Sequence, residues 1–200
     1  LSGCAGSSAQ STASSTAASS AAASSISTTA VSANYDGGSG TQEDPYQINS
    51  VDSLLTFASN VNDGSQGGYA GVSLKLTSDL DIGNMNDMET HSTLFLGSFD
   101  GDGHTISNLN YTSDVYNCGA GLFGVSCGEV KNLTLENATV TVTEGTSMAI
   151  GGVVGYNMGS VDNVTLKGDS TITGNNCVGG IVGGNNNSIT NCTVEGATVV

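Results

Sequence analysis

Three short segments bounded by glycine recur in the second half of this 200-residue chain: GLFG (residues 121–124), GVVG (152–155) and GIVG (180–183). The same residue types follow the first glycine of each segment at fixed distances: Val130, Val161 and Ile189 nine residues later, Asn132, Asn163 and Asn191 eleven residues later, and Leu135, Leu166 and Val194 fourteen residues later. The register holds inside each unit while the length between units varies. That behaviour is typical of a coiled scaffold with loops of variable length.

Inside each unit, apolar and polar residues alternate. In VKNLTLENATV, the residues predicted to point inward are Val130, Leu133, Leu135, Ala138 and Val140. Short alternating runs broken by Asn or Gly are typical of strands. A unit of two or three such strands cannot bury its own apolar face, so neighbouring units must stack. The sequence therefore predicts an all-β fold, a parallel β-helix or solenoid.

We interpret the repeated glycines as structural markers of each coil and not as a loop that holds a ligand. Glycine allows the backbone to turn tightly and to pack close to the next coil. The glycines assigned this role are Gly121, Gly124, Gly152, Gly155, Gly180 and Gly183. The stacked Asn132, Asn163 and Asn191 are predicted to form a ladder at a bend.

The formal net charge is −15, from 18 acidic residues and three lysines without any arginine. This balance excludes nucleic acid as a partner, because phosphate binding depends on Lys and Arg. It also disfavours an anionic membrane surface. The repeat alignment places Lys167 between Glu136 and Glu195, and Lys131 beside Asp162. Pairs of opposite charge on neighbouring strands contribute about 0.2–1 kcal/mol each, so the lysines have a structural explanation.

The first four residues, LSGC, resemble the bacterial lipobox, in which the cysteine is lipidated. By this resemblance Cys4 is the lipid anchor and the only contact with a membrane. Residues 5–33 are almost all Ser, Ala and Thr. Such a segment has too little apolar area to offset the entropy of ordering, so a flexible linker is predicted.

One helix is predicted, over residues 51–61. Its apolar face consists of Val51, Leu54, Leu55, Ala58 and Val61. Ser50 is the expected N-cap and Gly64 the expected C-terminal stop. Because a solenoid needs its first coil covered, we expect this helix to cap the N-terminal end.

These repeats, followed by strands such as VKNL, resemble the GLUG-motif repeats of bacterial cell-surface proteins. The preceding segments GTQEDPYQINSVDSLLTFASNVNDG (residues 40–64), LKLTSDLDIG (74–83) and GSFDGDGHTISNL (97–109) also resemble the region that precedes those repeats. The resemblance covers about residues 39–200, although the Trp often found before the FDG segment is missing. It implies a right-handed parallel β-helix on an exported protein, without any one activity.

Composition, motifs and this resemblance together divide the chain into three parts: residues 1–33 as the anchor and linker, 34–111 as the cap and first coils, and 112–200 as the GLUG-type repeats. The last unit is unfinished at Val200, so the repeats are expected to be truncated there. Some GLUG proteins carry separate catalytic domains, including immunoglobulin A-cleaving metallopeptidases. This chain has no H-E-x-x-H, so that activity does not carry over.

The strongest candidate for chemistry is FDGDGHT (residues 99–105), which contains Asp100, Asp102 and His104. At this spacing on a strand they would share one face and could bind a metal or exchange protons. The alternative, which we favour, is a Gly-rich turn in which Asp stabilises the bend. Asp79 and Asp81 could complete a Ca²⁺ site with them. No catalytic residue is assigned, and no cofactor is expected apart from this Ca²⁺ alternative.

The five cysteines form no C-x-x-C pair, so zinc spacing is absent. Cys118 and Cys177 share one repeat position but lie two coils apart, beyond disulfide reach, so no disulfide framework is predicted. Cys127 aligns with Met158 of the next unit. It is therefore expected to be the most exposed cysteine of residues 112–200.

The favoured function is adhesion, or display of a binding surface, by an extracellular protein on the cell surface. Its partner would be a carbohydrate or protein of a host or of the environment. One alternative is an enzyme acting on polysaccharide, a lyase or a hydrolase. A groove lined by carboxylates and aromatics would favour it, and a surface of Thr, Ser and Asn alone would exclude it. The other alternative is a structural spacer for a further domain.

Overall fold

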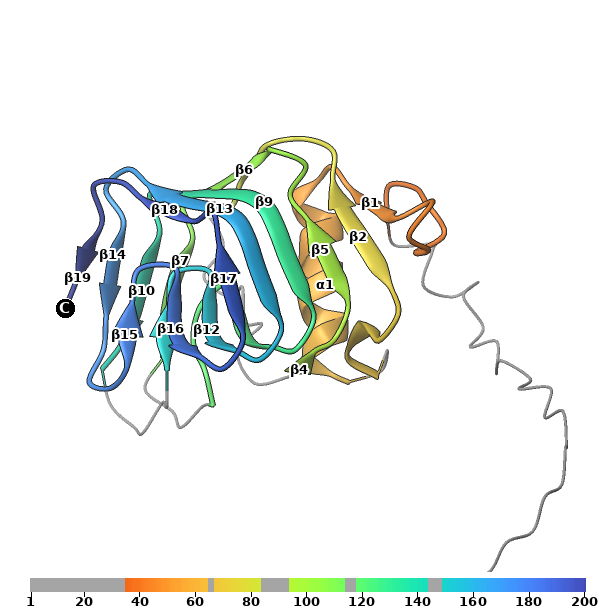
Figure 1. Ribbon diagram of the computed structural model, residues 1–200. Helices are drawn as coiled ribbons and strands as arrows, with labels where there is room; N and C mark the ends of the chain where they lie inside the picture. Colours follow the sequence, from red (N-terminus) through yellow and green to blue (C-terminus); the bar gives the residue numbers. More distant parts are fainter. Residues whose placement is uncertain (1–34, 65–66, 84–93, 114–117, 144–148) are drawn as a thin grey trace, which may run out of the picture.

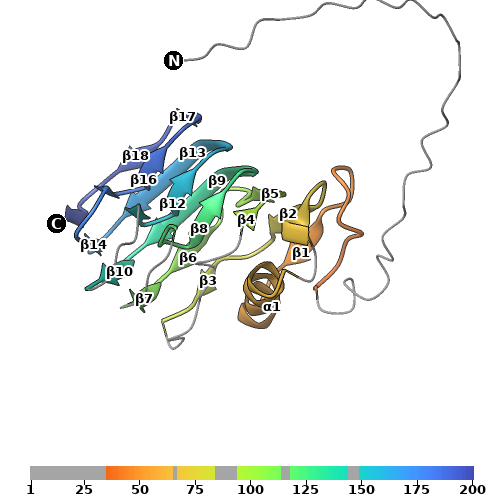
Figure 2. The ribbon, with the colours of Figure 1, turned by 90° about the horizontal axis from the view of Figure 1, so that it is seen from below.

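The chain winds into coils that stack along one common axis, and the strands of successive coils lie side by side (Figures 1 and 2). The computed structural model describes residues 35–64, 67–83, 94–113, 118–143 and 149–200. Every pair of strands in its four sheets is parallel. The predicted parallel β-helix is thus confirmed.

The largest sheet has nine strands. They are β1 (Tyr46–Ile48), β2 (Ser73–Leu76), β3 (Leu80–Asp81), β5 (Ser98–Asp100), β6 (Thr105–Ser107), β9 (Glu129–Glu136), β13 (Ser160–Lys167), β17 (Ser188–Thr190) and β18 (Thr193–Val194).

Three smaller sheets complete the coils. One contains β4 (Leu94–Phe95), β8 (Phe123–Ser126), β12 (Val154–Asn157) and β16 (Val182–Asn185). Another contains β7 (Asn110–Ser113), β10 (Thr139–Val142), β14 (Thr171–Thr173) and β19 (Thr198–Val199). The last contains β11 (Ile150–Gly151) and β15 (Val178–Gly179).

The register between coils is the one that the sequence repeats predicted. Val161 pairs with Val130 on one side and with Ile189 on the other, and Leu166 pairs with Leu135 and Val194. Val130, Val161 and Leu166 are all fully buried. The inward residues of successive coils therefore form one continuous apolar core, and each coil buries its face against its neighbours.

An asparagine bends the long strands β9 and β13 near their middle. Asn132 and Asn163 have φ values of +52°, in the left-handed region that asparagine tolerates better than most residues. The Nδ2 of Asn163 donates to the Oδ1 of Asn132 at 2.9 Å. Asn191 has the same backbone conformation, but its Nδ2 donates to the Oδ1 of Asp162 at 2.8 Å. The structure therefore brings Asn132 and Asn163 together, whereas Asn191 bonds to a carboxylate.

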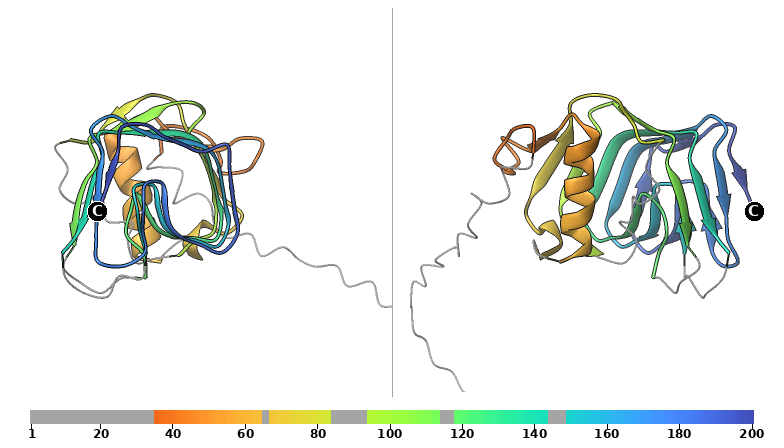
Figure 3. Two further views of the ribbon diagram at one scale, coloured as in Figure 1. Left: turned by 60° about the vertical axis from the view of Figure 1, so that its left-hand side comes forward. Right: turned by 180° about the vertical axis from the view of Figure 1, so that it is seen from behind.

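The glycine-bounded segments form an inward fold of the chain in each repeat coil, visible as a narrow U in the left view of Figure 3. A Cβ atom on Gly155 would lie 2.4 Å from the backbone nitrogen of Ala120. One on Gly183 would lie 2.3 Å from the backbone nitrogen of Ile150. These glycines are needed because the backbones of successive coils are in direct contact, which leaves no room for a side chain.

We therefore expect Gly155→Ala to destabilise the fold by about 3 kcal/mol, at the upper end of the usual cost of overpacking, because the obstructing atoms belong to backbone. Denaturant unfolding measures the difference. The control is Gly64→Asn, since Gly64 has open space around it and a φ of +67° that asparagine accepts. Equal losses in the two variants would contradict this role for Gly155.

The predicted capping helix is present as α1 (Val51–Asn62) and lies across the N-terminal end of the coils (Figure 3). Ser50 is its N-cap, and its hydroxyl accepts a hydrogen bond from the backbone N–H of Ser53. Gly64 follows the helix with a positive φ, as a C-terminal stop requires. The helix is followed by a short 3-10 segment, Gly67–Tyr69.

Aromatic side chains attach α1 to the first coils. Phe57 of the helix contacts Phe95, Phe99 and Phe123, with ring centroids 5.5–6.0 Å apart. Next to them the hydroxyls of Tyr35 and Tyr69 are 2.5 Å apart. Burial raises the pKa of Tyr35 well above its ordinary value.

A second polar ladder lies inside the molecule. Asn157 is fully buried. Its Nδ2 donates to the Oδ1 of Asn185 at 2.7 Å and to the backbone oxygen of Ser188 at 3.1 Å. Ser126 occupies the same register position one coil earlier. Among the described residues its buried hydroxyl has no hydrogen-bond partner, so the ladder begins with an unsatisfied group.

Asn157→Ala is expected to cost about 1–3 kcal/mol, because the buried backbone N–H of Gly159, which donates to Asn157 Oδ1 at 3.1 Å, loses its acceptor. Ser126→Ala removes a buried hydroxyl without a partner and is expected to leave stability unchanged or to raise it slightly. Thermal unfolding of both variants measures these two changes in stability. A Ser126→Ala protein as unstable as Asn157→Ala would show that the Ser126 hydroxyl is satisfied.

Candidate functional site: a polar groove beside the N-terminal cap

The outer face of the nine-stranded sheet carries a column of alternating charge. Along it, Lys75 pairs with Asp100, Asp100 with Lys131, and Lys131 with Asp162 in strand register. The third lysine, Lys167, pairs with Glu136, and their charged atoms are 3.4 Å apart. The lysines of the repeats therefore lie beside carboxylates of adjacent coils, as the sequence alignment predicted.

The FDGDGHT segment connects β5 to β6 through a tight turn. Asp102 and Gly103 both have positive φ values, +49° and +83°. The Oδ1 of Asp100 accepts a hydrogen bond from the backbone N–H of Asp102 at 2.8 Å. The carboxylate of Asp100 thus stabilises the bend, which is the turn role expected for this residue.

Of the five candidate metal ligands, Asp79 and His104 contact each other, and the other three have separate partners. Asp79 Oδ1 lies 3.1 Å from His104 Nδ1, Asp81 Oδ1 accepts from Asn108 Nδ2 at 2.8 Å, and Asp102 Oδ2 lies 2.9 Å from Lys75 Nζ. Asp100 faces Asn132, whose Nδ2 donates to its Oδ1 at 2.9 Å. Within the described part of the chain, no group of three or more His, Cys, Asp or Glu side chains is arranged to hold a metal ion.

Next to this turn, a groove of about 450 Å³ lies between the outer face of the sheet and the loops of the capped end. Its floor comes from β2, β5 and the start of β9, and its walls come from the loop that precedes β1 and from the segment that follows β4. The side chains and backbone that line it belong to Gln42, Pro45, Gly71, Val72, Ser73, Leu74, Leu96, Gly97, Ser98, Asp100, Gly128, Glu129 and Lys131.

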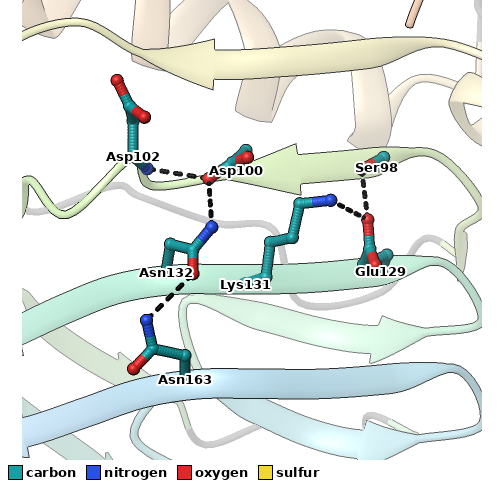
Figure 4. A network of polar contacts seen from close by, with 7 residues as sticks. All are labelled: Ser98, Asp100, Asp102, Glu129, Lys131, Asn132 and Asn163. Atoms are coloured by element: carbon teal, nitrogen blue, oxygen red, sulfur yellow. Dashed lines mark hydrogen bonds and ion pairs between the residues drawn. The ribbon is translucent and has the colours of Figure 1, made fainter.

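Figure 4 shows the polar network on the floor of this groove. The Oε2 of Glu129 accepts hydrogen bonds from the Ser98 hydroxyl at 2.9 Å and from the Lys131 ammonium at 2.6 Å. Asp100, on the neighbouring strand, connects to Asn132 and through it to Asn163. The asparagines at the bends of β9 and β13 are therefore hydrogen-bonded to the floor of the groove through Asp100.

Hydrogen bonding shifts the pKa values of charged groups on this face. The Glu129 carboxylate raises the pKa of Lys131, and the Asp102 carboxylate raises the pKa of Lys75. The hydroxyl of Thr190 and the amide of Asn191 lower the pKa of Asp162. The pKa of Asp79 is lowered by the backbone N–H of Thr105 and by His104. These shifts favour the charged forms of Lys75, Lys131, Asp79 and Asp162.

The groove offers donors and acceptors side by side. Serine hydroxyls and the Gln42 amide can both donate and accept, Glu129 and Asp100 accept, and Lys131 donates. Pro45 and Leu96 add apolar surface, and Leu96 is 37% exposed. Of the side chains that line the groove, none is aromatic. Such a surface suits a ligand rich in hydroxyl groups.

The lowered pKa of Asp162 predicts a pH dependence. A depressed carboxyl pKa contributes stability above the unfolded-state value of 3.8, and the contribution is lost as pH falls through the folded-state pKa. We expect the native chain to lose stability relative to Asp162→Asn between about pH 5 and about pH 3, because only the native residue titrates there. Denaturant unfolding at both pH values measures this. An equal loss of stability in the native chain and in Asp162→Asn would contradict this prediction.

Sequence reasoning singled out Asp100 but not its neighbours in the groove. Ser98, Glu129 and Lys131 lie in the outward columns that the register defines. Aligning β5 with β9 would have placed Glu129 opposite Ser98. Gln42, Pro45 and Leu96 come from segments outside the repeat, and no pattern in the sequence connects them to the groove.

None of the four cysteines in the described residues lines the groove. Cys118, Cys127, Cys177 and Cys192 are all free thiols. Cys118 and Cys177 are exposed whereas Cys127 is only partly so, and the expectation that Cys127 is the most exposed was wrong. Its turn packs against the preceding coil, since the backbone N–H groups of Cys127 and Gly128 both donate to the carbonyl of Phe95. Cys4 lies outside the described residues.

Comparison with known proteins identifies the GLUG motif at residues 146–173 and 174–200. The chain is 42% identical over 86 residues to halomucin of Haloquadratum walsbyi, which covers 42% of this chain and 1% of halomucin. It is 33% identical over 144 residues to a protein of Evansella cellulosilytica described as a Gly-rich membrane protein, which covers 69% of this chain and 16% of that protein. The chain thus corresponds to a small part of each relative.

Among solved structures, the chain is similar to a crystal structure described as that of an immunoglobulin A1 protease from Bacteroides ovatus. The TM-score is 0.55 at 20% identity, over 82% of this chain and 62% of that one. At this identity the likeness concerns the fold alone. Among the described residues, no helix is both long enough and apolar enough to cross a bilayer.

Proposed function

We propose that this chain is part of an exported bacterial cell-surface protein and that its groove binds carbohydrate. The GLUG motifs and the two relatives support the surface location, since one relative is named halomucin and the other a Gly-rich membrane protein. A lipid anchor at Cys4 is part of the proposal and rests on the LSGC motif. The chain would then present the β-helix outside the cell.

The observation that carries the binding proposal is the composition of the groove. Its volume of about 450 Å³ lies within the usual range for ligand sites, roughly 300–1,000 Å³. It combines hydroxyl, amide, carboxylate and ammonium groups with two apolar side chains at its edge. Sugars present hydroxyls that both donate and accept, together with apolar C–H faces, so they match this mixture.

The network favours binding over hydrolysis. An acid–base pair for glycoside cleavage needs one carboxyl group that donates a proton to the leaving oxygen. Here Glu129 accepts from both Ser98 and the Lys131 ammonium, while Asp100 accepts from a backbone N–H and from Asn132. Both carboxylates are therefore used as acceptors that hold the groove together.

A pair of matched variants tests the proposal. Ser73 and Ser160 occupy the same outward column, but only Ser73 lines the groove. Ser73→Tyr should fill the groove and weaken binding on a glycan array by at least about tenfold, a loss of about 1.4 kcal/mol. Ser160→Tyr, with the same change outside the groove, should bind as the native chain does.

Equal binding by the native chain and Ser73→Tyr would show that the groove is not the site. The absence of any glycan binding by the folded native chain would contradict the carbohydrate proposal. Incubation with polysaccharides, followed by assays for new reducing ends and for unsaturated products, tests the enzyme alternative. Release of either product would overturn binding as the sole function.

A further inference from the structure

One oxygen of the Asp100 carboxylate is used by the fold, and the other is not. Its Oδ1 accepts from the backbone N–H of Asp102 at 2.8 Å and from the Nδ2 of Asn132 at 2.9 Å. From the described residues, no hydrogen bond reaches its Oδ2 and no ammonium forms an ion pair with it. Because Asp100 lines the groove and is only partly buried, this second oxygen can bind a ligand.

The two lysines beside Asp100 each have another carboxylate as partner. Lys75 and Lys131 pair with Asp100 in strand register, on β2 and β9. The Nζ of Lys75 lies 2.9 Å from Asp102 Oδ2, and the Nζ of Lys131 lies 2.6 Å from Glu129 Oε2. Of these five side chains, Asp100 is therefore the one without an ion-pair partner.

The lining of the groove has a negative formal charge. The carboxylates of Asp100 and Glu129 and the ammonium of Lys131 line it, which gives a charge of −1. The whole chain has a net charge of −15 and no arginine. A field of this sign attracts cations and repels anions. Acidic sugars are therefore poor ligands, since the lysine that could bind them is already hydrogen-bonded to Glu129.

An amino sugar matches both the free carboxylate oxygen and the polar lining. Its protonated amine offers three donors and a positive charge, and its hydroxyls both donate and accept. Ser98 and Asp100 are two residues apart on β5 and face the same side, about 6.6 Å from each other along the strand. One sugar ring can therefore contact both side chains.

We infer that the groove takes a carbohydrate with a protonated amino group, such as an oligomer of glucosamine, and that the amine binds the Oδ2 of Asp100. This inference rests on the proposed carbohydrate-binding function and names the class of sugar. A hydrogen bond between an ammonium and a carboxylate is about twice as strong as one between neutral groups. An N-acetylated sugar lacks the charge and loses this contact.

Isothermal titration of the full chain with two oligosaccharides of equal length and linkage tests the inference. One consists of glucosamine and the other of N-acetylglucosamine. At about pH 5.5, where an aliphatic amine is protonated, the native chain should bind the glucosamine oligomer about tenfold more tightly, as expected for one hydrogen bond between charged groups. At about pH 9, where the sugar amine is neutral and lysine is still charged, this affinity should fall about tenfold.

Asp100→Asn and Asp162→Asn are matched variants. The two aspartates lie on opposite sides of Lys131 in strand register, and each substitution removes one negative charge, but only Asp100 lines the groove. Asparagine keeps an oxygen that can accept the two hydrogen bonds to Asp100 Oδ1. Asp100→Asn should bind the glucosamine oligomer about tenfold more weakly and the N-acetylated oligomer unchanged. Asp162→Asn should bind both as the native chain does.

Circular dichroism establishes that each variant is folded. If Asp100→Asn does not fold, the comparison of the two pH values, which uses the native chain, decides in its place. A folded Asp100→Asn protein that keeps the preference for glucosamine would overturn the inference. So would an equal loss of preference in Asp162→Asn, because it would show attraction by overall charge.

The result for the two oligomers also separates this inference from the proposed function. Equal affinity of the native chain for both oligomers, lost in Ser73→Tyr, would overturn the amino-sugar inference and leave carbohydrate binding in the groove supported. Absence of binding to these oligomers and to every sugar of the glycan array would overturn both.

Discussion

Direct contact between backbones, at the glycines of each inward bend, is the constraint on which this fold depends. A Cβ on Gly155 or Gly183 would meet backbone atoms of the preceding coil at less than 2.5 Å. Only a chain that bends in the same way can lie so close, so each coil fits best on a copy of itself. The parallel register between the repeat coils is consistent with that fit.

The stacking of identical residues in successive coils also determines where polar side chains find hydrogen-bond partners. Asn157 is fully buried, yet its amide bonds to Asn185 of the next coil. On the outside, Asn163 bonds to Asn132, and Asn132 bonds to Asp100. An amide satisfies an identical amide one coil away because it both donates and accepts. Where a different residue enters the column, as Ser126 does, the pairing fails.

The repeated part of the chain was predictable from its sequence, and the groove was not. Val130, Val161 and Ile189 recur at one distance behind a glycine, so their register could be read directly. The helix was predictable because Ser50, the apolar face and Gly64 form a local pattern. The groove instead depends on Gln42, Pro45 and Leu96, which follow no period. Their meeting depends on how the cap folds over the first coils, which is a matter of tertiary packing.

The separation of the groove from the repeats has a consequence for how such proteins vary. The groove is built from the cap and the first coils, with β9 as the last strand that contributes. The units that follow, residues 146–173 and 174–200, carry the GLUG motif and no residue of the groove. Gain or loss of whole units would change the length of the rod in steps of one coil, about 4.8 Å. The length of the rod and the proposed binding groove can thus evolve independently within one chain.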